Sequence, residues 1–230
     1  MMGLLVIKKT AWSIKKCVNV AIISFMFGSI IFLFAYIGML NDVGIGSYNG
    51  SILLWMVNHR ESFITSIMKI LTSAADPIII AIIVSTVAAY WGYLKREIWR
   101  PFLLISTVML TAGITTLIKV VTSNMRPPVI DMITPFELDY SFPSGHTLII
   151  IICLLVIGYF ICSRNSSKRC TTIWITTATI GVSLVAFSRL YLGYHWLTDV
   201  VASVGLGLMI FAAVIIIDIL FRSKVKKLNY

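Results

Sequence analysis

The chain has 230 residues, of which 59% are hydrophobic and only 12% are charged, and its formal net charge is +10. Soluble domains are about half apolar and about a quarter charged, so this composition excludes an ordinary soluble protein. The basic residues lie in short segments between long apolar runs, a pattern typical of membrane topology signals, which argues against nucleic acid as a partner.

The apolar runs predict six membrane-spanning helices, because a helix needs about 20 apolar residues to cross a bilayer. The first run follows a basic segment and lacks a clear cleavage site, so we interpret it as a retained helix. Residues 46–72 are apolar but interrupted by polar side chains, which predicts short interfacial helices. Asp76-Pro77 is a typical helix start and opens the second span. The predicted spans are 17–40, 76–94, 102–121, 144–162, 171–187 and 195–221.

These elements predict an all-α polytopic membrane protein in which residues 1–230 form one integral-membrane domain. Most of the 19 basic residues fall on one side of the predicted topology. The positive-inside rule places that side, with both termini, in the cytoplasm, and we expect a bacterial plasma membrane. The loops 122–143 and 189–195 then face outward. The basic residues of the cytoplasmic side are Lys8, Lys9, Lys15, Lys16, Lys95, Arg96, Arg100, Arg164, Lys168, Arg169, Arg222, Lys224, Lys226 and Lys227.

Three polar segments stand at the outer ends of the predicted spans, where ionisable side chains are costly. Residues 119–127 contain two cations, residues 143–146 contain a histidine, and residues 188–199 contain an arginine, a histidine and an aspartate. Taken singly, each residue has a structural explanation, such as an arginine that snorkels to the interface. Their gathering on one membrane face favours a functional site.

The cations of these segments predict a site for a multiply charged oxyanion. Lys119, Arg126 and Arg189 supply three positive charges, and a guanidinium matches the geometry of phosphate oxygens. Ser144 and Gly145 open the fourth span, where free backbone N–H groups favour an anion and a glycine lets it approach closely. The pattern therefore indicates phosphate binding.

His195 and Asp199 are four residues apart at the predicted start of the last helix, so they would share one face. A carboxylate that holds one imidazole nitrogen leaves the other free as a nucleophile. His146 would serve as a general acid toward the leaving oxygen. No carboxylate cluster suits Mg²⁺, and the four cysteines lack metal-ligand spacing, so the sequence predicts phosphoryl transfer without metal or cofactor.

The three segments read K-x6-R-P, P-S-G-H and S-R-x5-H-x3-D. Together they resemble the signature motifs of the type 2 phosphatidic acid phosphatase superfamily, the lipid phosphate phosphatases. The resemblance implies a helical-bundle core with the active site at the outer membrane face. It implies that His195 becomes a phosphohistidine, that Asp199 orients it, and that His146 protonates the leaving group and then helps activate water. The three cations and the backbone at Ser144 and Gly145 would hold the phosphate.

The implied function is hydrolysis of a lipid phosphomonoester or diphosphate within the bilayer. Candidate substrates are phosphatidylglycerophosphate, phosphatidic acid, and undecaprenyl or other isoprenoid diphosphates. Six spans favour a substrate with an acyl or prenyl chain, because a helix bundle can admit it sideways from the membrane. One alternative is a phosphotransferase that passes the phospho group to an alcohol. The other is a non-enzymatic lipid-phosphate binding or transport protein, which would leave the histidine–aspartate pair without a purpose.

Overall fold

The computed structural model describes residues 12–164 and 167–228, and within these ranges the regular structure is entirely helical. Lys8 and Lys9, which enter the charge-based topology, lie outside the described residues. The α-helices of the described ranges are α1 (Ile14–Asn41), α2 (Asn49–Asn58), α3 (Ser62–Ala74), α4 (Pro77–Lys95), α5 (Trp99–Thr122), α6 (Gly145–Cys162), α7 (Lys168–Tyr191) and α8 (Leu197–Leu228). Two short 3-10 helices are η1 (Gly46–Tyr48) and η2 (Val129–Asp131).

Six of these helices, α1 and α4 to α8, are long and apolar enough to cross a membrane, which confirms the predicted span count. Most extend a few residues past the predicted apolar runs, because helical hydrogen bonding continues into polar flanks. The last helix, in contrast, starts two residues later than the predicted span. It begins at Leu197, so His195 lies in the turn before α8 and not in its first turn.

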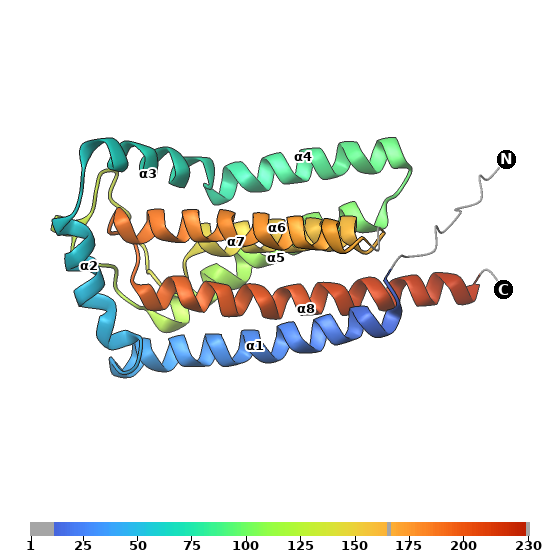
Figure 1. Ribbon diagram of the computed structural model, residues 1–230, viewed down its shortest axis with the longest axis horizontal. Helices are drawn as coiled ribbons and strands as arrows, with labels where there is room; N and C mark the ends of the chain where they lie inside the picture. Colours follow the sequence, from blue (N-terminus) through green and yellow to red (C-terminus); the bar gives the residue numbers. More distant parts are fainter. Residues whose placement is uncertain (1–11, 165–166, 229–230) are drawn as a thin grey trace.

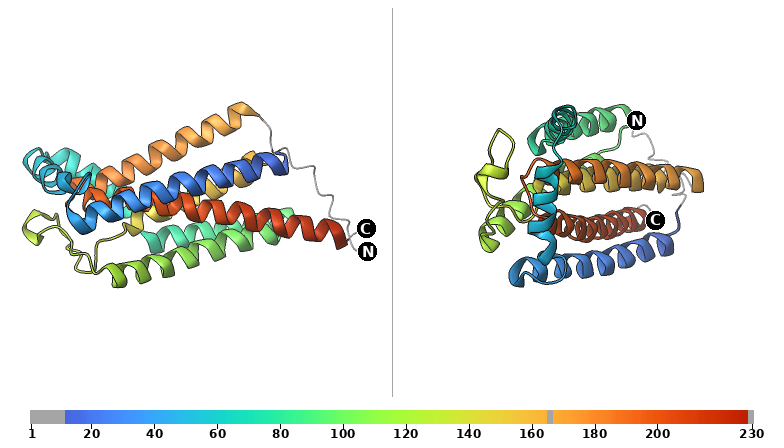
Figure 2. Two further views of the ribbon diagram at one scale, coloured as in Figure 1. Left: turned by 90° about the horizontal axis from the view of Figure 1, so that it is seen from below. Right: turned by 60° about the vertical axis from the view of Figure 1, so that its left-hand side comes forward.

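The spans form one bundle with α6 at its centre (Figures 1 and 2). Helix α6 packs against α4, α5, α7 and α8, and 61% of its most apolar stretch is buried inside the protein. Helix α1 lies along α8 through a close backbone approach. A Cβ atom built on Gly28 would stand 2.6 Å from the carbonyl oxygen of Gly205. Small residues are typical of such tight contacts between membrane helices.

The segment expected to hold interfacial helices forms α2 and α3. Helix α2 lies across one end of the bundle, whereas α3 packs along α7 (Figure 1). Arg60, between the two helices, donates to the carbonyl oxygens of Tyr191 at 3.0 Å and Asp131 at 2.7 Å. These bonds tie α3 to the end of α7 and to the loop before α6, so the segment covers this end of the bundle.

The opposite end of the bundle contains a buried ion pair that corrects one expectation. The charge pattern groups Arg100 with the basic residues between the second and third predicted spans, but its side chain is only 3% exposed and donates to Asp218 at 3.2 Å. The reason is that α5 already begins at Trp99, which turns Arg100 inward toward α8. Asp218 also accepts from Trp99 and Tyr159, so this buried carboxylate is fully hydrogen-bonded.

Candidate active site

The structure brings the predicted site residues together at one end of the bundle. The ends of α5 and α7 and the starts of α6 and α8 all lie there, beneath α2 and α3 (Figures 1 and 2). Lys119 lies in the last turn of α5 and Arg189 in the last turn of α7. Arg126 follows α5 in the loop to α6. His146 lies in the first turn of α6, and Asp199 in the first turn of α8.

His195 and Asp199 form a buried pair. The Nδ1 atom of His195 lies 3.2 Å from Oδ2 of Asp199, and both side chains are at most 1% exposed. The other ring nitrogen, Nε2, lies 3.3 Å from the guanidinium of Arg126. A carboxylate only accepts and a guanidinium only donates, so the partners assign the proton to Nδ1 and a free electron pair to Nε2. The arrangement suits a neutral histidine that attacks through Nε2.

The carboxylate of Asp199 is fixed by two further donors. Oδ2 accepts from the backbone N–H of Trp196 at 2.9 Å, which caps the start of α8. Oδ1 accepts from Nδ2 of Asn124 at 3.3 Å, and the same amide donates to Ser141. Asn124 was not among the predicted site residues, although it lies within the first motif and its amide holds the Asp199 carboxylate.

Burial holds the pKa of His195 well below its ordinary value, and the nearby charges of Arg126 and Arg189 lower it further. Both effects penalise the protonated ring, since a buried cation loses its hydration and faces other cations. The imidazole is therefore neutral at physiological pH. A neutral ring is the form in which histidine is a nucleophile.

The lowered pKa of His195 predicts a pH dependence of stability. The unfolded chain takes up a proton at this histidine below about pH 6.5, whereas the folded protein does not until lower pH. Protons therefore favour the unfolded state, and stability is lost as the pH falls from about 6.5 toward the folded pKa. We expect His195→Gln to show a smaller drop in Tm between pH 7.5 and pH 5.5 than the wild type, measured in detergent.

A matched control is His59→Gln, because His59 lies exposed just after α2, where its ring contacts the carbonyl oxygen of Trp55 and stacks on the Trp55 ring. This variant should keep the wild-type pH dependence. An equal drop in the wild type and in His195→Gln would show that His195 is not the group responsible.

Arg126 and Arg189 are anchored to the protein on one side. Arg126 donates to the carbonyl oxygen of Tyr194 at 2.6 Å, next to the histidine. Arg189 is buried, donates to Thr72 on α3 at 2.8 Å and stacks over the ring of Tyr194 at 4.5 Å. Its Nε atom is buried without a hydrogen-bond partner in the described residues. An unused buried N–H costs free energy, so the surrounding structure must offset this cost.

Two acidic side chains outside the predicted site residues contact these cations. Glu137 accepts from Arg189 at 2.5 and 2.6 Å and pairs with Arg126 at 2.8 Å. Asp139 accepts from Arg126 at 2.7 Å and pairs with Lys119. A usable signal was their position, because few acidic residues occur in this chain and these two stand between the first two motifs.

The start of α6 differs in detail from the expected anion site. Ser144 is the N-cap, but its own backbone N–H already donates to the carbonyl oxygen of Asp199 at 3.3 Å. The N–H groups of Gly145 and His146 have no partner within the helix. A Cβ on Gly145 would find its nearest protein atom at 3.7 Å, so protein packing does not require a glycine there. The His146 ring is half-buried and hydrogen-bonds to none of the described residues.

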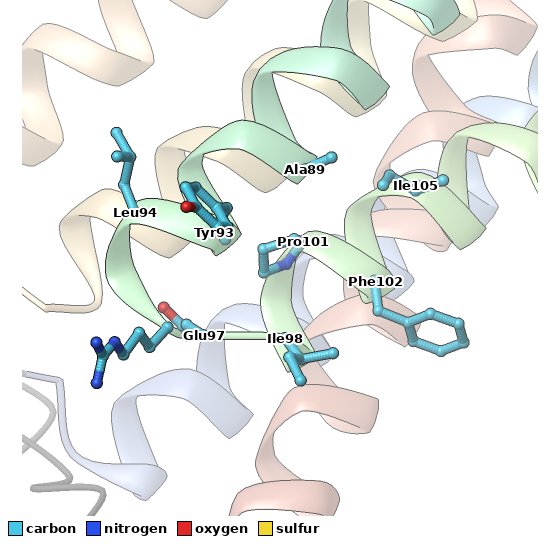
Figure 3. Close-up of a pocket in the computed structure, with 10 residues that line it drawn as sticks. Ala89, Tyr93, Leu94, Glu97, Ile98, Pro101, Phe102 and Ile105 are labelled. Atoms are coloured by element: carbon cyan, nitrogen blue, oxygen red, sulfur yellow. The ribbon is translucent and has the colours of Figure 1, made fainter. Parts of the chain in front are cut away.

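A cavity of about 710 Å³ opens at the opposite end of the bundle, between the end of α4 and the start of α5 (Figure 3). Tyr93, Glu97 and Phe102 are among its lining residues. It shares no residue with the histidine–aspartate pair and contributes nothing to that site. Among residues 12–164 and 167–228, no group of three or more His, Cys, Asp or Glu side chains is arranged to hold a metal ion.

The helical bundle and its site define a polytopic membrane protein with a histidine–aspartate pair facing clustered cations. The chain belongs to the PAP2 superfamily, whose family model matches residues 100–221 and so includes every predicted site residue. It is therefore a membrane phosphatase, which removes the non-enzymatic binding or transport alternative.

Named relatives agree with this assignment. Phosphatidylglycerophosphatase B of Bacillus subtilis (strain 168) is 29% identical over 155 residues, which cover 66% of this chain and 74% of the relative. Undecaprenyl-diphosphatase of Sulfolobus acidocaldarius is 38% identical over 76 residues, which cover 33% of this chain and 32% of the relative. The crystal structure of a transmembrane PAP2 type phosphatidylglycerolphosphate phosphatase from Bacillus subtilis has a similar fold. Its TM-score is 0.72 at 24% identity, over 86% of this chain and 95% of the other.

Proposed function

We propose that this phosphatase hydrolyses the terminal phosphate of a membrane lipid through a phosphohistidine at His195. The observation that carries the proposal is the pair of contacts of its ring, with Nδ1 at 3.2 Å from the Asp199 carboxylate and Nε2 at 3.3 Å from Arg126. The contact with Asp199 leaves the electron pair of Nε2 unprotonated, and the contact with Arg126 places that electron pair beside a guanidinium that can hold phosphate oxygens.

In the proposed first step, Nε2 of His195 attacks phosphorus in line with the leaving lipid oxygen. The P–N bond forms, the P–O bond to the lipid breaks, and His146 donates a proton to the leaving oxygen. In the second step, His146 takes a proton from water as its oxygen attacks phosphorus. The P–N bond then breaks and inorganic phosphate leaves. Lys119, Arg126 and Arg189 offset the charge on the phosphate oxygens in both steps, together with the free N–H groups at the start of α6.

We favour phosphatidylglycerophosphate as the substrate, because the relative with that named activity matches two thirds of the chain. An isoprenoid diphosphate is the second candidate, since a relative named for that activity matches a shorter segment. Phosphatidic acid follows as a simpler monoester. A phosphotransferase would use the same phosphohistidine and pass it to an alcohol, so added acceptor alcohols would divert product from phosphate to a new ester.

We also propose that residues 1–230 act as one domain in the plasma membrane, with both termini in the cytoplasm and the site on the outer side. The charge distribution supports this orientation. Cations at the site end are paired with acidic side chains, as in Lys119–Asp139 and Arg189–Glu137. Basic residues at the other end, such as Lys95, Arg96 and Lys168, leave an excess of positive charge there, which favours the cytoplasmic side.

Phosphate release from a lipid panel tests the substrate proposal. Purified protein in detergent with EDTA is given phosphatidylglycerophosphate, phosphatidic acid, undecaprenyl diphosphate and water-soluble glycerol phosphate. We expect the highest kcat/KM with phosphatidylglycerophosphate and the lowest with the soluble ester, because an acyl chain adds apolar surface that is buried when the substrate binds. Faster turnover of the soluble ester, or activity that disappears in EDTA, would contradict the proposal.

A further inference from the structure

Glu137 and Asp139, here called the carboxylate pair, form ion pairs with the cation cluster. Glu137 bridges Arg126 and Arg189, and Asp139 bridges Lys119 and Arg126. Every cation expected to hold phosphate is therefore bound to a carboxylate oxygen. Carboxylate and phosphate oxygens make the same kind of charge-assisted hydrogen bond with a guanidinium. The pair thus takes the place that phosphate oxygens would need.

The carboxylate pair also matches the charge of a terminal phosphate. The three cations carry three positive charges and the pair carries two negative charges, which leaves one net positive charge. A terminal phosphate monoester carries about two negative charges at neutral pH. It can replace the pair without changing the net charge of the site. A phosphodiester headgroup carries one negative charge, so in place of the pair it would leave the cations with two net positive charges.

The pair lies on the exposed side of the cations. The side chain of Asp139 is 61% exposed and that of Glu137 is 26% exposed, against 5% for Arg126 and 1% for Arg189. Leu138 between them is 83% exposed. The two arginines keep their bonds to Tyr194 and Thr72 if the pair moves away. Thr72 and the carbonyl oxygen of Tyr194 therefore hold the two arginines independently of the carboxylate side chains. Arg126 also donates through Nε to the backbone carbonyl oxygen of Asp139 at 2.8 Å, a bond that does not involve the carboxylate.

Asp139 stays ionised in this position. Burial raises its pKa, but the hydrogen bond from Lys119 and the charge of Arg126 outweigh that effect, so its pKa lies below its ordinary value. The negative charge is thus present at neutral pH, and the ion pairs with Lys119 and Arg126 must be broken before an anion can bind there.

We propose that the carboxylate pair is a displaceable phosphate mimic that makes the site selective for terminal phosphate dianions over phosphodiesters. The proposal rests on the proposed function, in that the cation cluster is the phosphate site. Phosphodiester headgroups are singly charged, and a bilayer presents them at high local concentration. A tethered pair of carboxylates competes with every anion, but a singly charged diester replaces only half of the charge that it displaces. The dianion of a terminal phosphate replaces all of it.

The test measures anion binding without turnover. Calorimetry at pH 8 compares inorganic phosphate, a dianion, with dimethyl phosphate, a singly charged diester, on wild type and on Glu137→Gln/Asp139→Asn. We expect the double variant to bind both anions more tightly than the wild type does. The gain in affinity should be about tenfold larger for dimethyl phosphate than for phosphate, so that selectivity for phosphate falls. Asp139→Asn alone, at an exposed position, should show the same direction. Glu97→Gln, which removes an acidic residue paired with Arg164 at the other end, should match the wild type.

Weaker phosphate binding by the double variant would overturn the proposal, because the pair would then be a scaffold that positions the arginines. An equal gain for both anions would also overturn it, since the pair would block the site without selecting. The proposed function fails separately. If Arg126→Gln binds phosphate as tightly as the wild type, the cation cluster is not the phosphate site. If the predicted order of binding holds but no lipid in the panel is hydrolysed, the substrate proposal fails and the selectivity of the pair stands.

Discussion

His195→Ala is expected to reduce phosphate release by about 10³-fold or more while leaving the protein folded. The variant removes the nitrogen that would attack phosphorus, and no other described side chain has its position between Asp199 and Arg126. The loss should fall on kcat, because the three cations proposed to bind phosphate remain. Steady-state kinetics with phosphatidylglycerophosphate measure the effect, and Tm in detergent shows that the variant is folded.

The control for this prediction is His59→Ala, which removes the exposed histidine that follows α2 and should keep wild-type activity. A direct readout is also available. Wild-type protein quenched in alkali during turnover of a ³²P-labelled lipid should carry an acid-labile label, as a phosphohistidine would, and His195→Ala should carry none. Substantial activity in His195→Ala, or a label that persists in it, would assign the nucleophile to another group.

The sequence predicted the convergence of the site because motif residues at helix ends can meet only at the ends of the bundle. Lys119 and Arg189 close two helices, and Asp199 opens another, so antiparallel packing brings them together. The same reasoning gave the pairing of His195 with Asp199 but placed both on one helix. The helix starts later, because the Asp199 carboxylate accepts from the backbone N–H of Trp196 and so caps a first turn that begins at Leu197.

Other contacts were beyond sequence reasoning because they depend on how loops and helices dock. Thr72 reaches Arg189 only because α3 packs along α7, and no local pattern marks that threonine. The contacts of Glu137 and Asp139 arise in a 22-residue connection between α5 and α6, whose path is set by long-range bonds such as Asn124–Ser141. Apolar periodicity gives helices and their order, whereas partners of buried charges require the assembled structure.

Asp199→Asn is the second variant with a large expected effect, a loss of about 10³- to 10⁴-fold in kcat with little change in KM. The carboxylate presents only acceptors, to the ring of His195, to the N–H of Trp196 and to the amide of Asn124. An asparagine has one oxygen for these three donors. If its NH₂ group faces the ring, it must donate to Nδ1, the ring proton moves to Nε2, and the nucleophilic electron pair is lost. The negative charge that would stabilise the proposed phosphohistidine disappears as well.

The matched control is Asp218→Asn on the same helix, because Asp218 is equally buried but lies at the far end of the bundle. It leaves the buried charge of Arg100 without its carboxylate, so it should lower Tm clearly while the remaining folded protein keeps its kcat. The two variants thus separate two roles of a buried aspartate in one helix, chemistry at Asp199 and stability at Asp218. If both variants lose kcat and Tm in proportion, Asp199 acts only as a structural residue and the orienting role assigned to it is wrong.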